Sequence, residues 1–348
     1  MKRLVHSALV FAITASLLVL FARGANLAEV WNHILTADWP LLIVALVASS
    51  SAYVLRARRW QFLLRPVGPT RFAGALRATI MGFAASFVLP GRTGEVLRPY
   101  LLARGEGLSA MAAFATIVVE RLLDLIGVLL LFAAFLSVVH PERGIANAYL
   151  FRAVQIGGLA AGALSVMAFV VLVVAARHPD RALRVVQRVA AVLSPALAEK
   201  VAGTARTFLV GLSILREPGD AAIALAGAFP LWLCSAVSIW CVSEAFHLGV
   251  PVSGTFLLLM LLVVGVSVPT PGGVGSVHYA FRLGATVLYG ASDDRAVGAA
   301  IVLHALTIVP VSLAGVYLAA AGGLSLQRLR GLAATDTLTP LNSPAGNS

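Results

Sequence analysis

Charged residues are scarce in this sequence, and cysteine is nearly absent. Only 12% of the 348 residues are charged, whereas a soluble domain carries about 25%. This deficit excludes an ordinary water-soluble domain and indicates that lipid surrounds much of the chain. The two cysteines, Cys234 and Cys241, stand in one apolar run. Their separation along a helix, roughly 10 Å, excludes a disulfide between them.

The sequence also lacks the signatures of common enzymes and of nucleic-acid-binding proteins. It contains no P-loop, no Gly-x-Ser-x-Gly and no His-Glu-x-x-His motif. Its formal net charge is +11, as in many nucleic-acid-binding proteins, but the sequence contains no zinc-finger, RNA-recognition or helix-turn-helix pattern. We therefore expect no nucleic-acid partner, metal site or cofactor, and we assign no catalytic residues.

Long hydrophobic runs dominate the chain, of which 59% is hydrophobic. A membrane-spanning helix needs about 20 apolar residues. Six runs meet this need: 4–22, 38–55, 109–139, 153–176, 221–248 and 296–321. We interpret the first as an uncleaved span, because Arg23-Gly24-Ala25 is a poor signal-peptide cleavage site. The sequence therefore predicts an all-α polytopic membrane protein with one transmembrane domain, 1–330, and a disordered tail, 331–348.

Two further apolar stretches, 78–90 and 254–290, are interrupted by proline and glycine, which break a helix at membrane depth. The breaks contain Pro90, Gly91 and Gly94 in the first, and Pro269, Pro271, Gly272, Gly273 and Gly275 in the second. Both breaks contain the pattern Pro-Gly-x-x-Gly. About thirty residues after each break comes a span that contains a polar site. We predict two re-entrant hairpins in an inverted repeat, about 78–139 and 254–321. Chance similarity between apolar segments is the alternative.

The basic residues are unevenly placed. Three predicted linkers between apolar runs, 56–77, 98–104 and 177–216, together with both termini, hold 19 of the 26 basic residues. The positive-inside rule then places both termini in the cytoplasm and the protein in the cytoplasmic membrane. Segment 177–216 alternates arginine with apolar residues. It is either an amphipathic helix pair on anionic lipid headgroups or an ordinary solvated loop.

The first break is followed by Arg92, Glu95 and Arg98, spaced by three residues. Helical spacing puts neighbouring members on one face, where Glu95 can pair with either arginine. The helix that starts there also points its N-terminus toward the same place, which favours a phosphate. Arginine suits phosphate because its planar fork can bond two oxygens at once.

A second cluster, Glu120, Arg121 and Asp124, lies inside an otherwise apolar run. Each charge near the bilayer centre costs about 2.5–3.5 kcal/mol, so the three require partners. One interpretation is that they line a polar path and join Arg92 and Arg98 around a lipid headgroup. The other is that they clamp the hairpin to the span and touch no substrate.

The second half offers weaker candidates: His278, Arg282 and His304. A histidine inside a span is either a packing residue or, because it titrates near neutral pH, a proton carrier. We keep the three as a second candidate site.

Three motifs occur in a fixed order along the chain. They are Leu89-Pro90-Gly91-Arg92-Thr93-Gly94-Glu95-Val96-Leu97-Arg98, Glu120-Arg121-Leu122-Leu123-Asp124, and Pro269 to Gly275. With them the chain resembles the flippase-like family named after the transmembrane region of lysylphosphatidylglycerol synthase. The resemblance implies translocation of an anionic phospholipid or a polyprenyl- or hopanoid-type lipid between leaflets. The alternative is a membrane enzyme or accessory subunit acting on lipid-linked substrates in envelope lipid or glycan assembly. Its partners would be the lipid substrate, and either a second copy or a lipid-biosynthesis protein.

Overall fold

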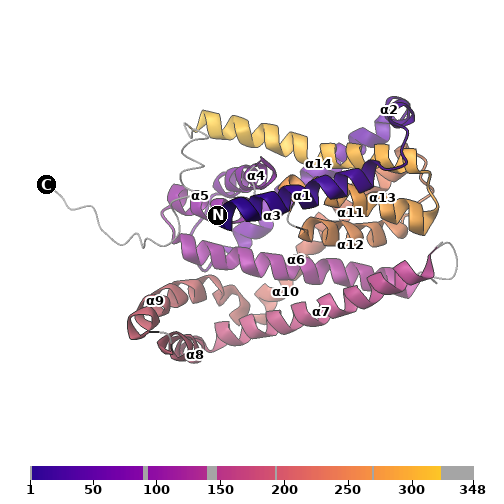
Figure 1. Cartoon of the computed structure of the whole chain (residues 1–348). Coiled ribbons are helices and arrows are strands. Elements are labelled where there is room, and N and C mark those ends of the chain that lie inside the picture. Colours follow the sequence, from indigo (N-terminus) through magenta and orange to yellow (C-terminus); the bar gives the residue numbers. More distant parts are fainter. Residues whose placement is uncertain (1, 89–92, 139–146, 193, 269, 323–348) are drawn as a thin grey trace.

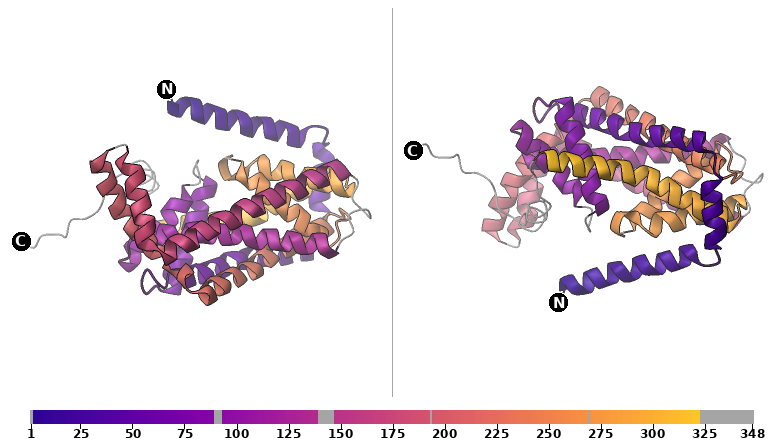
Figure 2. Two further views of the ribbon diagram at one scale, coloured as in Figure 1. Left: turned by 90° about the horizontal axis from the view of Figure 1, so that it is seen from below. Right: turned by 90° about the horizontal axis from the view of Figure 1, so that it is seen from above.

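The structure is a computed structural model that describes residues 2–88, 93–138, 147–192, 194–268 and 270–322; these ranges contain helices and no strand. The long helices run side by side in one general direction (Figure 1). The start of α1 (Lys2–Ala22) lies at the same end of the bundle as α5, α8 and α9, and α2 (Leu27–Leu35) lies at the opposite end. Figure 2 shows α1 along one side of the bundle, outside the other helices. The all-α prediction is therefore confirmed.

Four of the predicted spans coincide with segments long and apolar enough to cross a membrane. They are α3 (Trp39–Leu63), α7 (Ala148–Arg177), the continuous pair α10 and α11 (Pro218–Ala226 and Ala228–Ala245), and α14 (Asp293–Ala321). A fifth is formed by Ala12–Ala22 and α2 if that pair, bent by 78°, is one span. The run 109–139 forms α6 (Ala110–Val138), which has the length of a span but carries three charged side chains.

Helix α7 shows most clearly that lipid faces the outside of the bundle. Only 11% of its most apolar segment is buried. Large apolar side chains such as Ile156, Leu159 and Leu164 are exposed along it. A contiguous apolar surface of this length is unfavourable in water and favourable in hydrocarbon.

The prediction that a basic linker begins at residue 56 is wrong. Helix α3 continues to Leu63, and Arg56 and Arg59 lie inside the protein. The reason is that carboxylates of α6 face this part of α3 and pair with both guanidinium groups. The polar end of α3 is thus packed against protein where the hydrophobicity pattern indicated a solvated loop.

The first broken stretch forms two short helices, α4 (Phe72–Val88) and α5 (Gly94–Glu106), which pack against each other. Residues Pro90, Gly91 and Arg92 lie outside the described residues. Gly94 begins α5, and a side chain there would overlap the carbonyl oxygen of Gly82 in α4. Glycine at this position is therefore what allows the two backbones to touch.

The second broken stretch contains α12 (Gly254–Ser267), a short 3-10 turn η3 (Pro271–Gly273), α13 (Ser276–Leu283) and a π-helical turn η4 (Gly284–Leu288). Pro269 lies outside the described residues. Gly272, Gly273 and Gly275 have φ of 60°, 73° and 84°, a region that other residues rarely adopt. A Cβ on Gly272 would lie 3.1 Å from the carbonyl oxygen of Phe87, so this turn touches the end of α4.

Segment 177–216 forms two helices that pack together, α8 (Pro179–Ala191) and α9 (Pro195–Gly211), followed by a 3-10 turn, η2 (Ser213–Arg216). The segment therefore has the helix pair of the first alternative, while its contact with lipid stays a prediction. The tail, 331–348, lies outside the described residues.

Two groups of buried apolar residues hold the bundle together. One contains Trp60, Leu63, Leu102 and Leu123, at the end where α3, α5 and α6 meet. The other gathers α11, α12, α13 and the start of α14. The charged residues of α3, α5 and α6 lie beside the first group, and packing within that group holds these three helices in place.

Candidate functional site

Six charged side chains from three helices meet inside the bundle, and we call this group the arginine cluster. Helix α3 contributes two, α5 one and α6 three. The members are Arg56, Arg59, Arg98, Glu120, Arg121 and Asp124. All except Arg121 are buried, and the side chain of Arg121 is 36% exposed.

Glu120 is the centre of the arginine cluster. Its Oε1 accepts hydrogen bonds from Arg56 Nη1 at 3.1 Å, Arg98 Nη1 at 2.8 Å and Arg121 Nη2 at 2.8 Å. The side chain is completely buried. Its other oxygen, Oε2, has no hydrogen-bond partner among the described residues. One carboxylate oxygen therefore holds guanidinium groups from three different helices.

Asp124 lies one helical turn after Glu120, so the two carboxylates share a face of α6. Its Oδ2 accepts a hydrogen bond from Arg56 and lies 3.7 Å from Arg121 Nη1. Its Oδ1 is 2.7 Å from Arg59 Nη1. Arg59 also donates from Nη2 to the backbone carbonyl of Glu120 at 3.0 Å. Together the two carboxylates bind α3 to α6.

The charges of the arginine cluster do not balance. Four guanidinium groups face two carboxylates, which leaves a formal excess of two positive charges. Buried, uncompensated charge is costly away from water. The Nε and Nη2 atoms of Arg98, and the Nε atoms of Arg59 and Arg121, have no hydrogen-bond partner among the described residues. The arrangement therefore has both the charge and the free donors to bind an anion.

Aromatic rings surround the guanidinium groups. The guanidinium carbon of Arg98 lies 3.9 Å from the ring centre of Trp60, whose Nε1 donates to Thr116 at 2.9 Å. Phe83 of α4 lies 5.4 Å from Arg56 and 5.9 Å from Arg121. Stacking of this kind stabilises a cation out of water and holds the plane of the guanidinium.

The structure brings together four of the six residues assigned to the site from the sequence: Arg98, Glu120, Arg121 and Asp124. Glu95 is half-buried in the first turn of α5, and within the described residues Arg98 pairs with Glu120. Arg92 lies outside the described residues.

Arg56 and Arg59 were missed by the sequence analysis. They stand three residues apart at the end of an apolar run, next to Trp60. This spacing places two cations on one helical face, and it is the signal that could have identified them.

In the second half, His278 and His304 lie together, with ring centres 4.3 Å apart. The Nδ1 atom of His278 accepts a hydrogen bond from the backbone of Gly275 at 3.2 Å. His304 Nε2 is buried without a hydrogen-bond partner among the described residues. Within these ranges no group of three His, Cys, Asp or Glu side chains is placed to hold a metal ion.

Arg282 does not join the two histidines. Its guanidinium donates to the carbonyl oxygens of Leu20, Phe21 and Arg23, where α1 ends, and pairs with Asp293 at the start of α14. These contacts satisfy helix-end carbonyls and fasten α1 to α13.

Comparison with known proteins agrees with this architecture. The family described as "Lysylphosphatidylglycerol synthase TM region" matches residues 7–315. The chain is also similar to "Glycosyltransferase AglD" of Haloferax volcanii, with 23% identity over an alignment of 329 positions that covers 87% of this chain and 52% of that protein. It thus spans about half the length of this curated relative. The match over most of the chain, together with its membrane helices, shows that the protein belongs to the lysylphosphatidylglycerol synthase TM region family.

Proposed function

We propose that the protein binds the anionic headgroup of a membrane lipid at the arginine cluster and passes that lipid between leaflets. The observation that carries the proposal is the excess of two guanidinium groups over carboxylates in a buried site. A bound phosphate would compensate this excess and would accept hydrogen bonds from donors that have no protein partner. Acyl or isoprenoid chains would stay in the bilayer.

Arg98 and Arg121 are the residues best placed to hold the headgroup. Arg98 has two buried nitrogen atoms without hydrogen-bond partners among the described residues. Arg121 has the only substantially exposed side chain among the six members of the cluster, at 36%. Glu120 and Asp124 act as positioning residues, because each holds several guanidinium groups at once. Arg92, outside the described residues, stays a predicted further ligand.

The two broken stretches supply the moving parts of this proposal. We take α4 with α5, and α12 with α13, as re-entrant hairpins of an inverted repeat that accompany six spans, with both termini in the cytoplasm. Supporting this, the turn at Gly272 lies against Phe87, so the two broken stretches meet. The basic helices α8 and α9 lie at the same end of the bundle as the start of α1 (Figure 1). Alternate opening of the hairpins would expose the arginine cluster to one side and then to the other.

A second candidate function is a part in assembling lipid-linked glycans, as a membrane enzyme or an accessory subunit. The name of the relative, a glycosyltransferase, favours it. This function and translocation share the requirement for an anionic lipid headgroup. They differ in product: an enzyme changes the mass of the lipid, and a translocator changes only its leaflet.

Translocation is testable in proteoliposomes that contain phosphatidylglycerol with a fluorescent headgroup-proximal label. A membrane-impermeant reductant bleaches the outer leaflet, so the slow loss of the remaining signal measures movement between leaflets. Arg98→Gln and Arg121→Gln should each slow this loss about tenfold or more, because a hydrogen bond to a charged group is worth about 1.5–3 kcal/mol. Arg104→Gln, an exposed arginine of α5, is the matched control. Unchanged rates in both cluster variants would overturn the proposal, and a change in lipid mass would favour the second candidate.

A further inference from the structure

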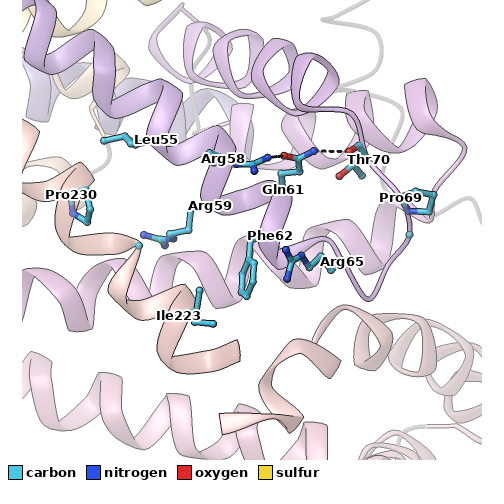
Figure 3. Close-up of a pocket in the computed structure, with 12 residues that line it drawn as sticks. Leu55, Arg58, Arg59, Gln61, Phe62, Arg65, Pro69, Thr70, Ile223 and Pro230 are labelled. Atoms are coloured by element: carbon cyan, nitrogen blue, oxygen red, sulfur yellow. Dashed lines mark hydrogen bonds between the residues drawn. The ribbon is translucent and has the colours of Figure 1, made fainter. Parts of the chain in front are cut away.

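A groove with a volume of about 710 Å³ lies on the side of the bundle next to the arginine cluster. It is bounded by the last turns of α3, by the connection to α4 and by the segment where α10 continues into α11 (Figure 3). Its volume lies within the range of about 300–1,000 Å³ that is usual for ligand sites.

Among the described residues, those that line the groove include three arginines and no carboxylate. Arg58 and Arg65 are exposed at the groove, and Arg59 is buried at its inner side. Arg58 donates to Gln61 at 2.6 Å, and Gln61 donates to the carbonyl oxygen of Thr70 at 2.7 Å, as the dashed lines of Figure 3 show.

Arg65 is held in a different way. Its guanidinium carbon lies 4.5 Å from the ring centre of Phe62. Both exposed guanidinium groups are therefore positioned by neighbours that carry no negative charge, so their own charge stays available to an anion.

Apolar residues complete the lining and show where the groove lies in the membrane. Leu55, Phe62, Ile223 and Pro230 are among them, and Ile223 is 57% exposed. Ile223 belongs to the apolar segment Pro218–Ala245, and α3 is itself a span. Polar and apolar lining meet at the ends of these two spans, where lipid headgroups lie. A membrane lipid with a phosphate headgroup matches this combination, whereas a free phosphate leaves the apolar lining without a partner.

Arg59 belongs both to the groove and to the arginine cluster. Its guanidinium reaches Asp124 at 2.7 Å, and its side-chain carbons pass over Gly227. A Cβ on Gly227 would lie 3.1 Å from Arg59 Cδ, so glycine leaves the room that this side chain uses. The side chain of Arg59 thus lies between the groove and the buried arginine cluster.

We infer that the groove is the access site for the lipid: Arg58 and Arg65 first bind the headgroup phosphate, which then passes Arg59 to reach the arginine cluster. The identity of the lipid class rests on the proposed function. Binding in the groove, however, requires no movement between leaflets, so it can be measured separately.

The test uses the full chain in phosphatidylcholine nanodiscs that contain a small fraction of phosphatidylglycerol. One acyl chain of this phosphatidylglycerol carries a photoreactive group close to the glycerol backbone. After illumination, mass spectrometry maps the labelled peptides. We expect labelling within residues 55–70 and 218–230. Arg58→Gln combined with Arg65→Gln should reduce it about thirtyfold at subsaturating lipid, since each arginine near a membrane surface contributes about a factor of five.

Arg77→Gln combined with Arg104→Gln, which removes two other exposed arginines, is the matched control and should leave the labelling unchanged. Photoreactive phosphatidylcholine should label the groove weakly, and millimolar inorganic phosphate should not compete. Equal labelling by both lipids, equal labelling of the groove variant and wild type, or displacement by inorganic phosphate would each overturn the inference. If translocation is absent while this labelling pattern holds, the transport proposal fails and the lipid site in the groove stands.

Discussion

Arg98 Nη1 donates to Glu120 Oε1 at 2.8 Å, and this contact joins the first broken stretch to the long helix α6. Both side chains are buried. The same carboxylate oxygen also holds Arg56 of α3. A single acidic residue thus fixes the relative positions of α3, α5 and α6, the three helices that carry the arginine cluster.

Removing the charge of Glu120 should destabilise the protein strongly. Glu120→Gln would leave four guanidinium groups facing Asp124 alone. Breaking a buried charge network by removing one partner costs about 3–5 kcal/mol. Thermal unfolding followed by tryptophan fluorescence in detergent measures the loss. Glu95→Gln, a half-buried carboxylate at the start of α5, is the control, and its cost should be about 1 kcal/mol or less. Equal stability of the two variants would contradict the central role of Glu120.

The coupling between Arg98 and Glu120 gives a second prediction. In the Glu120→Gln background, Arg98→Gln removes a cation that has lost its partner. The double variant should therefore be less destabilised than the sum of the single changes, by about 0.5–3 kcal/mol. A double-mutant cycle of unfolding free energies checks this. Strict additivity would mean that the two side chains do not interact in the membrane-embedded protein.

The sequence was sufficient to predict the carboxylates of the site but not all of its arginines. Glu120 and Asp124 stand out because charges inside an apolar run require partners. Arg56 and Arg59 stand at the end of such a run, where arginine is typical of a cytoplasmic loop. What keeps them buried is contact with α6, more than sixty residues later in the chain. Their three-residue spacing places two cations on one helical face, but it does not reveal which helix they contact.

In the two broken stretches, too, the sequence predicted local backbone features but not contacts between distant segments. Proline and glycine predicted where the helices break, because these residues change the backbone directly. They did not predict that the turn at Gly272 touches Phe87. The groove was also hidden in the sequence, since it forms where α10 and α11 pass the end of α3.

The close packing of α4 and α5 gives a third prediction, with a control on the same helix. Gly94→Ala would drive a methyl group into the backbone of Gly82 and should destabilise the protein by about 1–3 kcal/mol. Gly105→Ala has no atom within 4 Å of the new methyl group, and should be neutral or stabilising by about 0.5 kcal/mol. Unfolding temperatures of the two variants in the same detergent decide the matter. Equal values would mean that the two helices do not touch at Gly94.

The contact between the two broken stretches gives the last prediction, which tests whether they must separate during transport. A Cβ on Gly272 would lie 3.7 Å from Phe87 Cα, so cysteines at the two positions are neighbours. Because Gly272 has φ of 60°, a cysteine there is strained, and the Gly272→Cys single variant is checked first for folding and for lipid movement. In a background with Cys234→Ser and Cys241→Ser, the pair Phe87→Cys and Gly272→Cys should cross-link under mild oxidation and stop lipid movement in proteoliposomes. Reduction should restore the rate that the double variant has before oxidation, and oxidation should leave each single cysteine variant at its own reduced-state rate. Lipid movement that continues in the fully cross-linked protein would show that opening between these two turns is not part of the mechanism.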